Sequence, residues 1–398
     1  MTAPQPSGSR KDSIIVHVFG RTDVGRTREH NEDAFVVADL TTGNATLQPE
    51  VRTHELGDRG SLFMVADGMG GAAAGEIASA MAIEVVLREF TETLTAAEAP
   101  EPSTYAAGLK RATAAANSEI HTFALEHPEF RGMGTTATIA ALLGDTLFLA
   151  QVGDSRAYLV RDGVALQITK DQSLMQKLIE AGEITEEEAE QSERRNIILQ
   201  ALGPESQIRV DLTHQQVRSN DTLIICSDGL SGQVRIDEIA RVVTEEPDLM
   251  TVCKRLIERA NENGGPDNIT VIAARFEGEG LTPPTSGDHV GHRVFPLASD
   301  SGQAPAVARP VVDPTSAATR ETPAMRRSTL KLASIPVPIP IELPTPQVSP
   351  TRRMRGSRIA LGLVVVFLAL AFWWTYRAAS SVVAPGARET AAPTPVTP

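Results

Sequence analysis

The chain has 398 residues, of which 41% are hydrophobic and 22% charged, so it is long enough for about two domains and a sizeable core. Its two cysteines exclude a disulfide-built scaffold and a cysteine-based zinc cluster, and they fit a reducing compartment. The formal net charge of -13 argues against nucleic-acid binding, which favours a basic face.

The charge is distributed unevenly. From residue 280 onward there are 12 Lys and Arg against 6 Asp and Glu, a balance of +6. Residues 1–279 therefore hold 25 basic and 44 acidic residues, a balance of -19. Such an acidic region repels anions unless bound cations reverse the local field.

The first residues divide into a polar lead-in and an apolar run. Residues 1–12 show no apolar periodicity, so they are predicted to be disordered. The run 14–20 follows two basic residues, as in a signal peptide. It is short, contains His17 and has no small-residue cleavage site, which favours a strand.

Residues 13–278 are predicted to form one α+β domain. Strands without intervening helices predict antiparallel pairing, and clustered helices favour a layered α+β arrangement over a doubly wound sheet. Segment 173–201 is a charged, helical insertion whose acidic run indicates a solvated face. The predicted strands are 14–19, 34–39, 62–66, 136–143, 146–151, 157–161, 222–227 and 269–276, and the long helices are 75–90 and 105–126.

Residues 279–358 are predicted to be a linker with a basic end. Segment 279–350 contains 13 of the 26 prolines, which is typical of an extended spacer. A docking site for a proline-reading domain is the alternative.

Residues 359–376 contain no charged residue and are predicted to be a transmembrane helix. Eighteen residues at ~1.5 Å each span about 27 Å, close to the hydrocarbon thickness. A buried core helix is the weaker alternative, because only the short tail 377–398 follows. More arginines precede this span than follow it: Arg352, Arg353, Arg355 and Arg358 lie just before it, and Arg377 and Arg388 lie after it. This excess of positive charge on the N-terminal side predicts a cytoplasmic N-terminal domain at the inner cell membrane.

Acidic motifs lie at several predicted strand ends. Neighbouring glycines allow carboxylates and backbone carbonyls to approach a common point, as a hard cation with six oxygen ligands requires. Any one motif could be an ordinary turn. Together they favour Mn²⁺ or Mg²⁺ over zinc, and two such ions ~3.5–4 Å apart would activate a bridging water against a phosphoester. The motifs are Asn31-Glu32-Asp33, Asp67-Gly68, Asp154-Ser155, Ser227-Asp228-Gly229 and Pro266-Asp267-Asn268.

Six runs within residues 13–277 resemble, in order, the motifs of the metal-dependent protein phosphatases of the 2C type. They are TDVGRTREHNEDAF, MVADGMGG, GMGTTAT, VGDSRAYL, ICSDGL and GGPDNITVI. The chain looks most like the bacterial branch that opposes Ser/Thr protein kinases, some members of which have a C-terminal transmembrane helix. The resemblance implies a four-layer α-β-β-α sandwich with a dinuclear Mn²⁺ or Mg²⁺ centre at one end.

The resemblance also implies residue roles. Asp67 would bridge both metals, the Gly68 carbonyl would bind one, and Asp228 and Asp267 would complete the other. Glu32 and Asp33 would support the metal on the Gly68 side, and Asp154 would share a third metal with Asp228. Arg28 matches the phosphate-binding arginine, and its guanidinium suits two phosphate oxygens. The residues with implied catalytic roles are Arg28, Asp67, Asp228 and Asp267.

The implied mechanism is in-line attack of metal-bound hydroxide without a phosphoenzyme. Ser155 is interpreted as a turn or cap residue rather than a nucleophile. Met69 replaces a histidine proposed as general acid in animal members, and Gln172 replaces the histidine of the usual D-H-S run. Segment 173–201 matches the flap beside the family's active site, so its acidic face is a candidate for substrate selection.

The leading hypothesis is a membrane-tethered, metal-dependent phosphoserine/phosphothreonine protein phosphatase with phosphoprotein substrates and Ser/Thr kinases as antagonists. One alternative is a catalytically inactive membrane sensor or scaffold. Another is a small-molecule phosphoesterase with a similar dimetal site.

Overall fold

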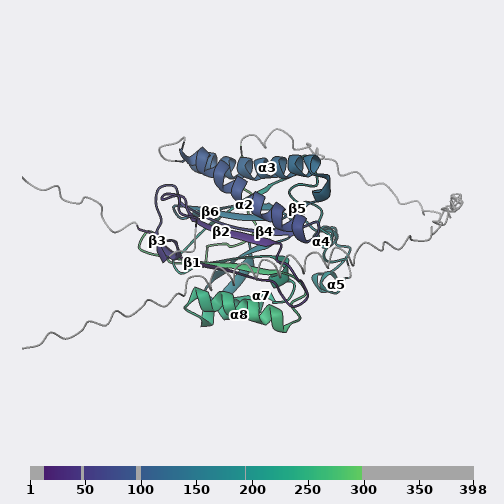
Figure 1. Cartoon of the computed structure of the whole chain (residues 1–398). Helices are drawn as coiled ribbons and strands as arrows, with labels where there is room; N and C mark the ends of the chain where they lie inside the picture. The colour runs from purple at the N-terminus through teal and green to yellow at the C-terminus, as the bar shows by residue number, and fades with distance from the viewer. Residues whose placement is uncertain (1–12, 46–48, 96–99, 193, 298–398) are drawn as a thin grey trace, which may run out of the picture. The chain divides into compact units, whose positions relative to one another are not determined.

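The computed structural model describes residues 13–45, 49–95, 100–192 and 194–297. Two antiparallel sheets lie face to face between two helical layers, as Figure 1 shows. The first sheet has the order β3 (Thr53–Glu55), β1 (Ile15–Asp23), β12 (Ile269–Glu277), β11 (Thr222–Cys226), β8 (Arg156–Arg161) and β9 (Val164–Gln167). The second has the order β10 (Asp211–Gln216), β7 (Thr146–Val152), β6 (Ala137–Leu143), β4 (Ser61–Met69) and β2 (Asp33–Asp39), with β5 (Gly134–Thr135) paired to β4.

The helices cover the outer face of each sheet. Helices α2 (Ala72–Thr95) and α3 (Pro102–Glu126) cover the sheet that contains β4, and α7 (Ile236–Glu245) and α8 (Leu249–Glu262) cover the other, as Figure 1 shows. Shorter helices lie in the connections: α1 (Pro49–Arg52), a 3-10 turn (Pro128–Phe130), α4 (Leu174–Glu180), α5 (Glu186–Glu190) and α6 (Asp228–Ser231).

Strand β4 shows why the layers form. Successive side chains of a strand point to opposite faces. Leu62 and Met64 belong to the apolar cluster under α2 and α3, whereas Phe63 and Val65 belong to the cluster between the two sheets. A third apolar cluster lies between the other sheet and α7 and α8. Three apolar layers therefore hold four layers of secondary structure together, and the predicted four-layer α+β fold is confirmed.

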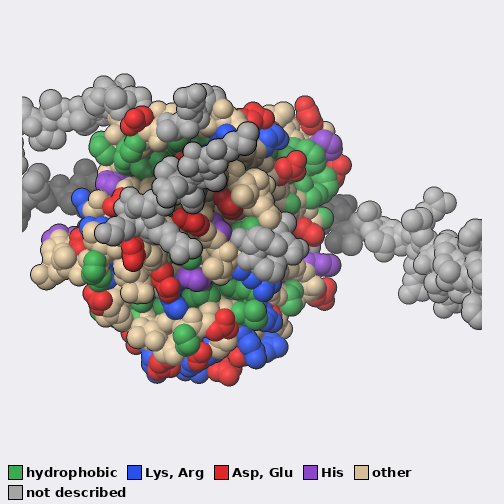
Figure 2. All heavy atoms as spheres, turned by 90° about the vertical axis from the view of Figure 1, so that its left-hand side faces the viewer, with side chains coloured by type: hydrophobic (Ala, Val, Ile, Leu, Met, Phe, Trp, Pro, Cys, Tyr) green, Lys and Arg blue, Asp and Glu red, His purple; other side chains and the backbone are tan. Residues whose placement is uncertain are grey.

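Ion pairs lie on the surface of the helical layer formed by α7 and α8. Figure 2 shows Lys and Arg beside Asp and Glu on the lower part of the face it presents. On α7 and α8, Arg259 lies 2.6 Å from Glu238, and Arg255 lies 3.2 Å from Glu245. Exposed pairs of this kind each contribute little to stability, about 0–1 kcal/mol.

The eight predicted strands are confirmed, with small differences at their ends. Four short strands, β3, β5, β9 and β10, were not predicted. The insertion 173–201 is less helical than expected: α4 and α5 end by residue 190, and the chain returns through turns and irregular backbone. We call residues 173–201 the flap.

The packed region continues beyond the predicted domain end at residue 278. Phe295 N–H donates to the Leu212 carbonyl at 2.9 Å, and the Phe295 ring lies 5.4 Å from the Phe148 ring. Leu297 is buried against the cluster under α3. Residues 289–295 therefore lie along the edge of β10, and Leu281 is buried between the two sheets. The prediction that the linker starts at residue 279 was wrong for this segment.

No helix within the described ranges is both long and apolar enough to cross a bilayer. The predicted transmembrane segment 359–376, the lead-in 1–12, the tail 377–398 and most of the predicted linker lie outside the described residues.

Candidate active site

Acidic side chains from distant parts of the chain meet at one end of the sandwich. Asp33 on β2 is the cross-strand partner of Asp67 on β4. The pKa of Asp67 is raised well above its usual range, first by burial and then by the charges of the other carboxylates. The predicted ligands Asp33, Asp67, Asp154, Asp228 and Asp267 therefore form one acidic cluster.

Gly68 permits a close backbone approach within this cluster. A Cβ atom there would lie 2.2 Å from the Gly75 carbonyl oxygen and 2.5 Å from that of Glu32. A Cβ atom on Gly75 would in turn lie 2.2 Å from a carboxylate oxygen of Glu32. Glycines at both positions are required because any side chain would overlap these atoms. The structure thus brings the Glu32 backbone carbonyl against Gly68 and the Glu32 carboxylate against Gly75.

Asp33 is buried with one oxygen satisfied and one left over. Its Oδ2 accepts hydrogen bonds from the hydroxyls of Ser227 at 2.8 Å and Thr270 at 2.7 Å. Its Oδ1 has no hydrogen-bond partner among the described residues. Burial raises the pKa of Asp33 to about 7, partly opposed by the two hydroxyls.

Asp154 is also a buried carboxylate with a raised pKa. Its Oδ1 is buried and finds no partner in the described part of the chain. Burial, followed by the charge of Asp228, raises the pKa of Asp154 to about 7. Burial, followed by the charge of Asp267, also raises the pKa of Asp228.

These observations test whether the residues fit divalent cations. Several buried carboxylates cannot all be ionised without positive charge nearby, and the unpartnered oxygens of Asp33 and Asp154 are free to accept a ligand bond. Within the described ranges, no three His, Cys, Asp or Glu side chains close around a single point. Mg²⁺ usually takes one or two carboxylates and keeps several waters, so shared carboxylates, a backbone carbonyl and water suit it. The donor set therefore fits hard cations.

Two residues not predicted as functional hold the acidic motifs together. Asn268 accepts from the Glu32 N–H at 2.8 Å, and its amide donates to the carbonyls of Val24 and His30 at 3.0 and 2.9 Å. Thr136 accepts from the Asp67 N–H at 3.0 Å and shares a hydrogen bond with Ser155 at 2.8 Å. Ser155 is fully buried in this contact, which supports its interpretation as structural.

Arg28 lies at the rim of the cluster. Its Nη2 lies 2.8 Å from Asp267 Oδ2, with the two side chains 47% and 27% exposed. The preceding residue ties the same loop down, because the Thr27 hydroxyl donates to the Pro266 carbonyl at 2.5 Å. The guanidinium is therefore exposed yet oriented, as binding of an incoming anion requires.

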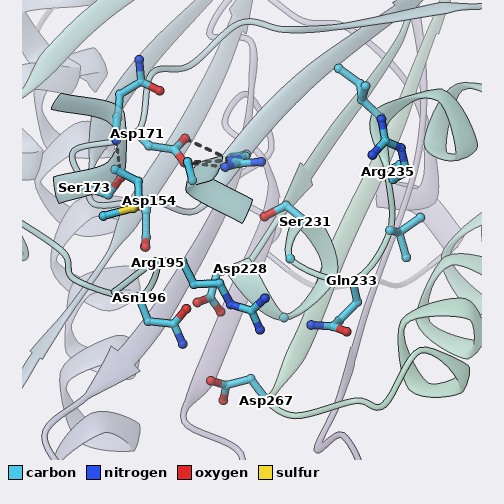
Figure 3. A pocket seen from close by; sticks show the side chains of 18 of the residues that line it. Asp154, Asp171, Ser173, Arg195, Asn196, Asp228, Ser231, Gln233, Arg235 and Asp267 are labelled. Atoms are coloured by element: carbon cyan, nitrogen blue, oxygen red, sulfur yellow. Dashed lines mark hydrogen bonds and ion pairs between the residues drawn. The ribbon is translucent and has the colours of Figure 1, made fainter. Parts of the chain in front are cut away.

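A pocket of about 730 Å³ opens beside the cluster. Figure 3 shows Asp154, Asp228 and Asp267 along it, with Arg235 and Gln233 on the side opposite Asp154 and Asp171. Arg156 forms a two-pronged ion pair with Asp171, with distances of 2.9 and 2.7 Å to Oδ2. The flap supplies one wall, and its lining residues are Ser173, Met175, Gln176, Ile179, Glu186, Ala189, Gln191, Arg195 and Asn196. The volume is typical of a site for a ligand larger than phosphate alone.

Comparison with known proteins shows the family of the chain. The family model described as "Protein phosphatase 2C" matches residues 45–272, more than half of the chain. The chain belongs to the protein phosphatase 2C family. It is 37% identical over 257 residues to "Serine/threonine phosphatase stp" of Listeria monocytogenes, covering 65% of this chain and 94% of that one.

Solved structures of 2C-type phosphatases share the fold. The crystal structure of the Mycobacterium tuberculosis serine/threonine phosphatase PstP/Ppp has a TM-score of 0.56 at 36% identity, and the match covers 66% of this chain and 99% of that one. A structure described as the catalytic domain of PstP in complex with two manganese ions has a TM-score of 0.54 at 36% identity, with the same coverage. The predicted membership in the bacterial Ser/Thr phosphatase group is thus confirmed.

Two histidines in and just after α3, His121 and His127, do not line the pocket. His121 contacts the Gly203 carbonyl at 2.7 Å, and the His127 ring stacks on Phe123 with centroids 4.1 Å apart. Met69, which stands where animal members have a histidine, pairs with Gly134 at the end of β4. Its thioether carries no proton to donate.

Proposed function

We propose that this chain is a protein-serine/threonine phosphatase that hydrolyses phosphoserine and phosphothreonine in proteins and depends on Mn²⁺ or Mg²⁺. This proposal rests on the buried cluster of carboxylates beside Arg28, in which the Oδ1 atoms of Asp33 and Asp154 have no hydrogen-bond partner among the residues that the structure describes. The family relationship and the manganese-containing relative support the same activity.

The proposed cation ligands are Glu32, Asp33, Asp67, the Gly68 carbonyl, Asp154, Asp228 and Asp267. When bound, divalent cations act as Lewis acids that activate a water nucleophile and neutralise phosphate charge. Arg28 would bind phosphate oxygens, with Asp267 orienting its guanidinium. Burial raises the pKa of both Cys226 and Cys253 to about 12, so neither thiol is a thiolate nucleophile at neutral pH.

The direct test uses the full chain with a phosphothreonine peptide, in Mn²⁺, in Mg²⁺ and in excess chelator. We expect phosphate release with metal and none with chelator. A parallel reaction with nucleotides separates the alternatives: release from nucleotides alone would indicate a small-molecule phosphoesterase. A folded chain that releases phosphate from neither substrate would support the inactive scaffold.

Arg28→Ala is expected to raise KM for the peptide roughly 10- to 100-fold while changing kcat less. Hydrogen bonds to charged groups are worth ~1.5–3 kcal/mol, and binding shared by ground and transition states appears in KM. Steady-state kinetics measure this split. Arg26→Ala is the matched control, because its backbone N–H holds the loop to Gly265 and its side chain does not line the pocket. An unchanged KM in Arg28→Ala would remove Arg28 from the phosphate site.

The metal-free protein should become less stable as pH rises. In the folded state the pKa values of Asp33 and Asp154 are about 7, above the ~3.9 of an unfolded Asp. Between about pH 4 and 7 the folded state holds more protons, so the free energy of unfolding falls with increasing pH.

Thermal unfolding in chelator should therefore give a higher Tm at pH 5.5 than at pH 8. Adding Mn²⁺ should raise Tm most at pH 8, where protons no longer compete for the carboxylates. Asp154→Asn should flatten the pH dependence in chelator. A metal-free Tm that rises with pH would contradict this account of the cluster.

We also propose that residues 359–376 hold the enzyme in a membrane, with the catalytic domain in the cytoplasm. The charge-free run and the preceding arginines support this. Membrane fractions of expressing cells should retain the full chain after alkaline carbonate extraction, whereas a chain ending at residue 350 should be released. Retention of both would place the anchor elsewhere. Opposition to cytoplasmic Ser/Thr kinases follows from the reaction.

A further inference from the structure

Gln172 stands where the family usually has a histidine, and it contacts three separate segments of the chain, around residues 151–153, 199 and 209. Its backbone N–H donates to the Gly153 carbonyl at 2.9 Å, and its carbonyl accepts from the Leu199 N–H at 2.7 Å. Its side-chain Oε1 accepts from the Gly153 N–H at 3.1 Å. Its Nε2 donates to the carbonyls of Gln151 at 3.4 Å and Arg209 at 3.2 Å.

The contacts with Gly153 bear directly on Asp154. Both backbone polar groups of Gly153 are bonded to Gln172, one through the backbone and one through the side chain. The other side of Gly153 is closed by Thr136, since a Cβ atom there would lie 2.6 Å from Thr136 Cγ2. Gly153 has φ of +102°, so the backbone entering Asp154 is held in a conformation that favours glycine.

The backbone carbonyl of Gln172 and the residues that follow it contact the flap. Ser173, the next residue, caps α4 by accepting from the Gln176 N–H. Leu174 N–H donates to the Ile197 carbonyl at 2.9 Å, so the entry and exit of the flap are paired beside Gln172. Gln172 therefore connects two segments. Its side chain and backbone N–H contact the loop that carries Asp154, and its backbone carbonyl contacts the base of the flap.

We propose that Gln172 is a positioning residue that holds Asp154 in its cation-binding orientation and ties that orientation to the flap. This inference rests on the proposed function, in which Asp154 binds a divalent cation. Residues that orient metal ligands typically change metal affinity or activity 10- to 100-fold when replaced. The hydrogen bond from the Gly153 N–H to Oε1 is the contact expected to matter most.

The test measures Mn²⁺ binding to the full chain by electron paramagnetic resonance of free Mn²⁺, together with kcat and KM for a phosphothreonine peptide. Mn²⁺ binding to the Asp154→Asn variant first shows which bound Mn²⁺ depends on Asp154. Gln172→Met keeps the side-chain length but removes the amide. It should lower the affinity for that Mn²⁺ roughly 10-fold or more and leave the affinity for the other Mn²⁺ unchanged. Gln172→Glu keeps an acceptor for the Gly153 N–H and should restore binding.

Gln200→Ala is the matched control. Gln200 Oε1 accepts from the Arg209 N–H at 2.7 Å, so this variant loses a side-chain contact to Arg209, which Gln172 also contacts, without touching Gly153. It should bind Mn²⁺ as the wild type does. Should Gln172→Met fail to fold, Gln172→Asn decides, because its shorter amide cannot span the same gap.

Two results would overturn the inference. Wild-type Mn²⁺ binding in a folded Gln172→Met or Gln172→Asn chain would do so, as would an equal loss in Gln200→Ala, which would indicate general loosening of the flap. A wild-type chain that neither binds Mn²⁺ nor releases phosphate would reject the proposed function and this inference with it. If the wild-type chain is active and the Gln172 variants bind Mn²⁺ as tightly as the wild type does, this inference alone is rejected.

Discussion

Asp67→Ala is expected to lower kcat for a phosphothreonine peptide about a thousandfold or more. Asp67 lies centrally in the cluster, because the charges of Asp33, Asp228, Asp154 and Asp267 all act on it. Loss of a shared ligand would remove charge stabilisation worth several kcal/mol, and each 1.36 kcal/mol is tenfold in rate. Steady-state kinetics in saturating Mn²⁺ measure the loss.

Loss of folding can be separated from loss of catalysis at this position. In chelator, Asp67→Asn should unfold at a higher temperature than the wild type, because one of several mutually repelling carboxylates becomes neutral. Asp145→Asn, in the turn between β6 and β7, should leave activity unchanged. An Asp67→Ala enzyme that keeps a tenth of wild-type kcat would show that Asp67 is not a required cation ligand.

Asp221→Ala is expected to destabilise the fold by about 3–5 kcal/mol. Arg161 and Asp221 form a two-pronged ion pair with distances of 2.8 and 2.6 Å, and their side chains are only 8% and 1% exposed. Removing the carboxylate leaves a buried guanidinium without its counter-charge. At roughly 2–4 °C per kcal/mol for a domain of this size, Tm should fall by about 10 °C.

An exposed ion pair provides the control for Asp221. Arg235 and Asp237 are 75% and 78% exposed and lie 3.5 Å apart, so Asp237→Ala should change stability by less than about 1 kcal/mol. Replacing both Arg161 and Asp221 by apolar residues of similar volume should recover most of the loss, because a buried pair is often no better than good packing. Equal Tm shifts in Asp221→Ala and Asp237→Ala would show that burial of the pair contributes nothing.

The strands were predictable where apolar residues follow a local pattern. Strand β4 is apolar on both faces and was found, whereas β10, with the sequence DLTHQQ, is too polar to be recognised. That strand becomes an element because its edges are bonded to β7 and to residues 289–295. The composition of 279–350 concealed this contact, since the prolines of the whole stretch favour an extended linker.

The site was predictable as a set of residues but not as a network. Glycine and aspartate in short motifs signal strand ends and candidate carboxylate ligands, and the family resemblance of these motifs implied the roles of Asp67, Asp228 and Asp267. Asn268 holds Glu32 from 236 positions away, and Gln172 holds Gly153 across the base of the flap. Asn268 stands in an acidic motif and Gln172 in the run that departs from D-H-S, but the local sequence does not show which distant atoms either amide contacts.

The sequence by itself determined the alternation of strands and helices, the order of the acidic motifs and the family resemblance, because each depends on residues a few positions apart. Only the tertiary structure decided which carboxylate oxygens are buried without partners, where residues 279–297 pack and which amide fixes the Asp154 loop. The physical reason is that burial and hydrogen bonding are properties of atoms brought together by the whole backbone path. A local pattern specifies an element, whereas its neighbours across the two sheets are specified only when the chain has folded.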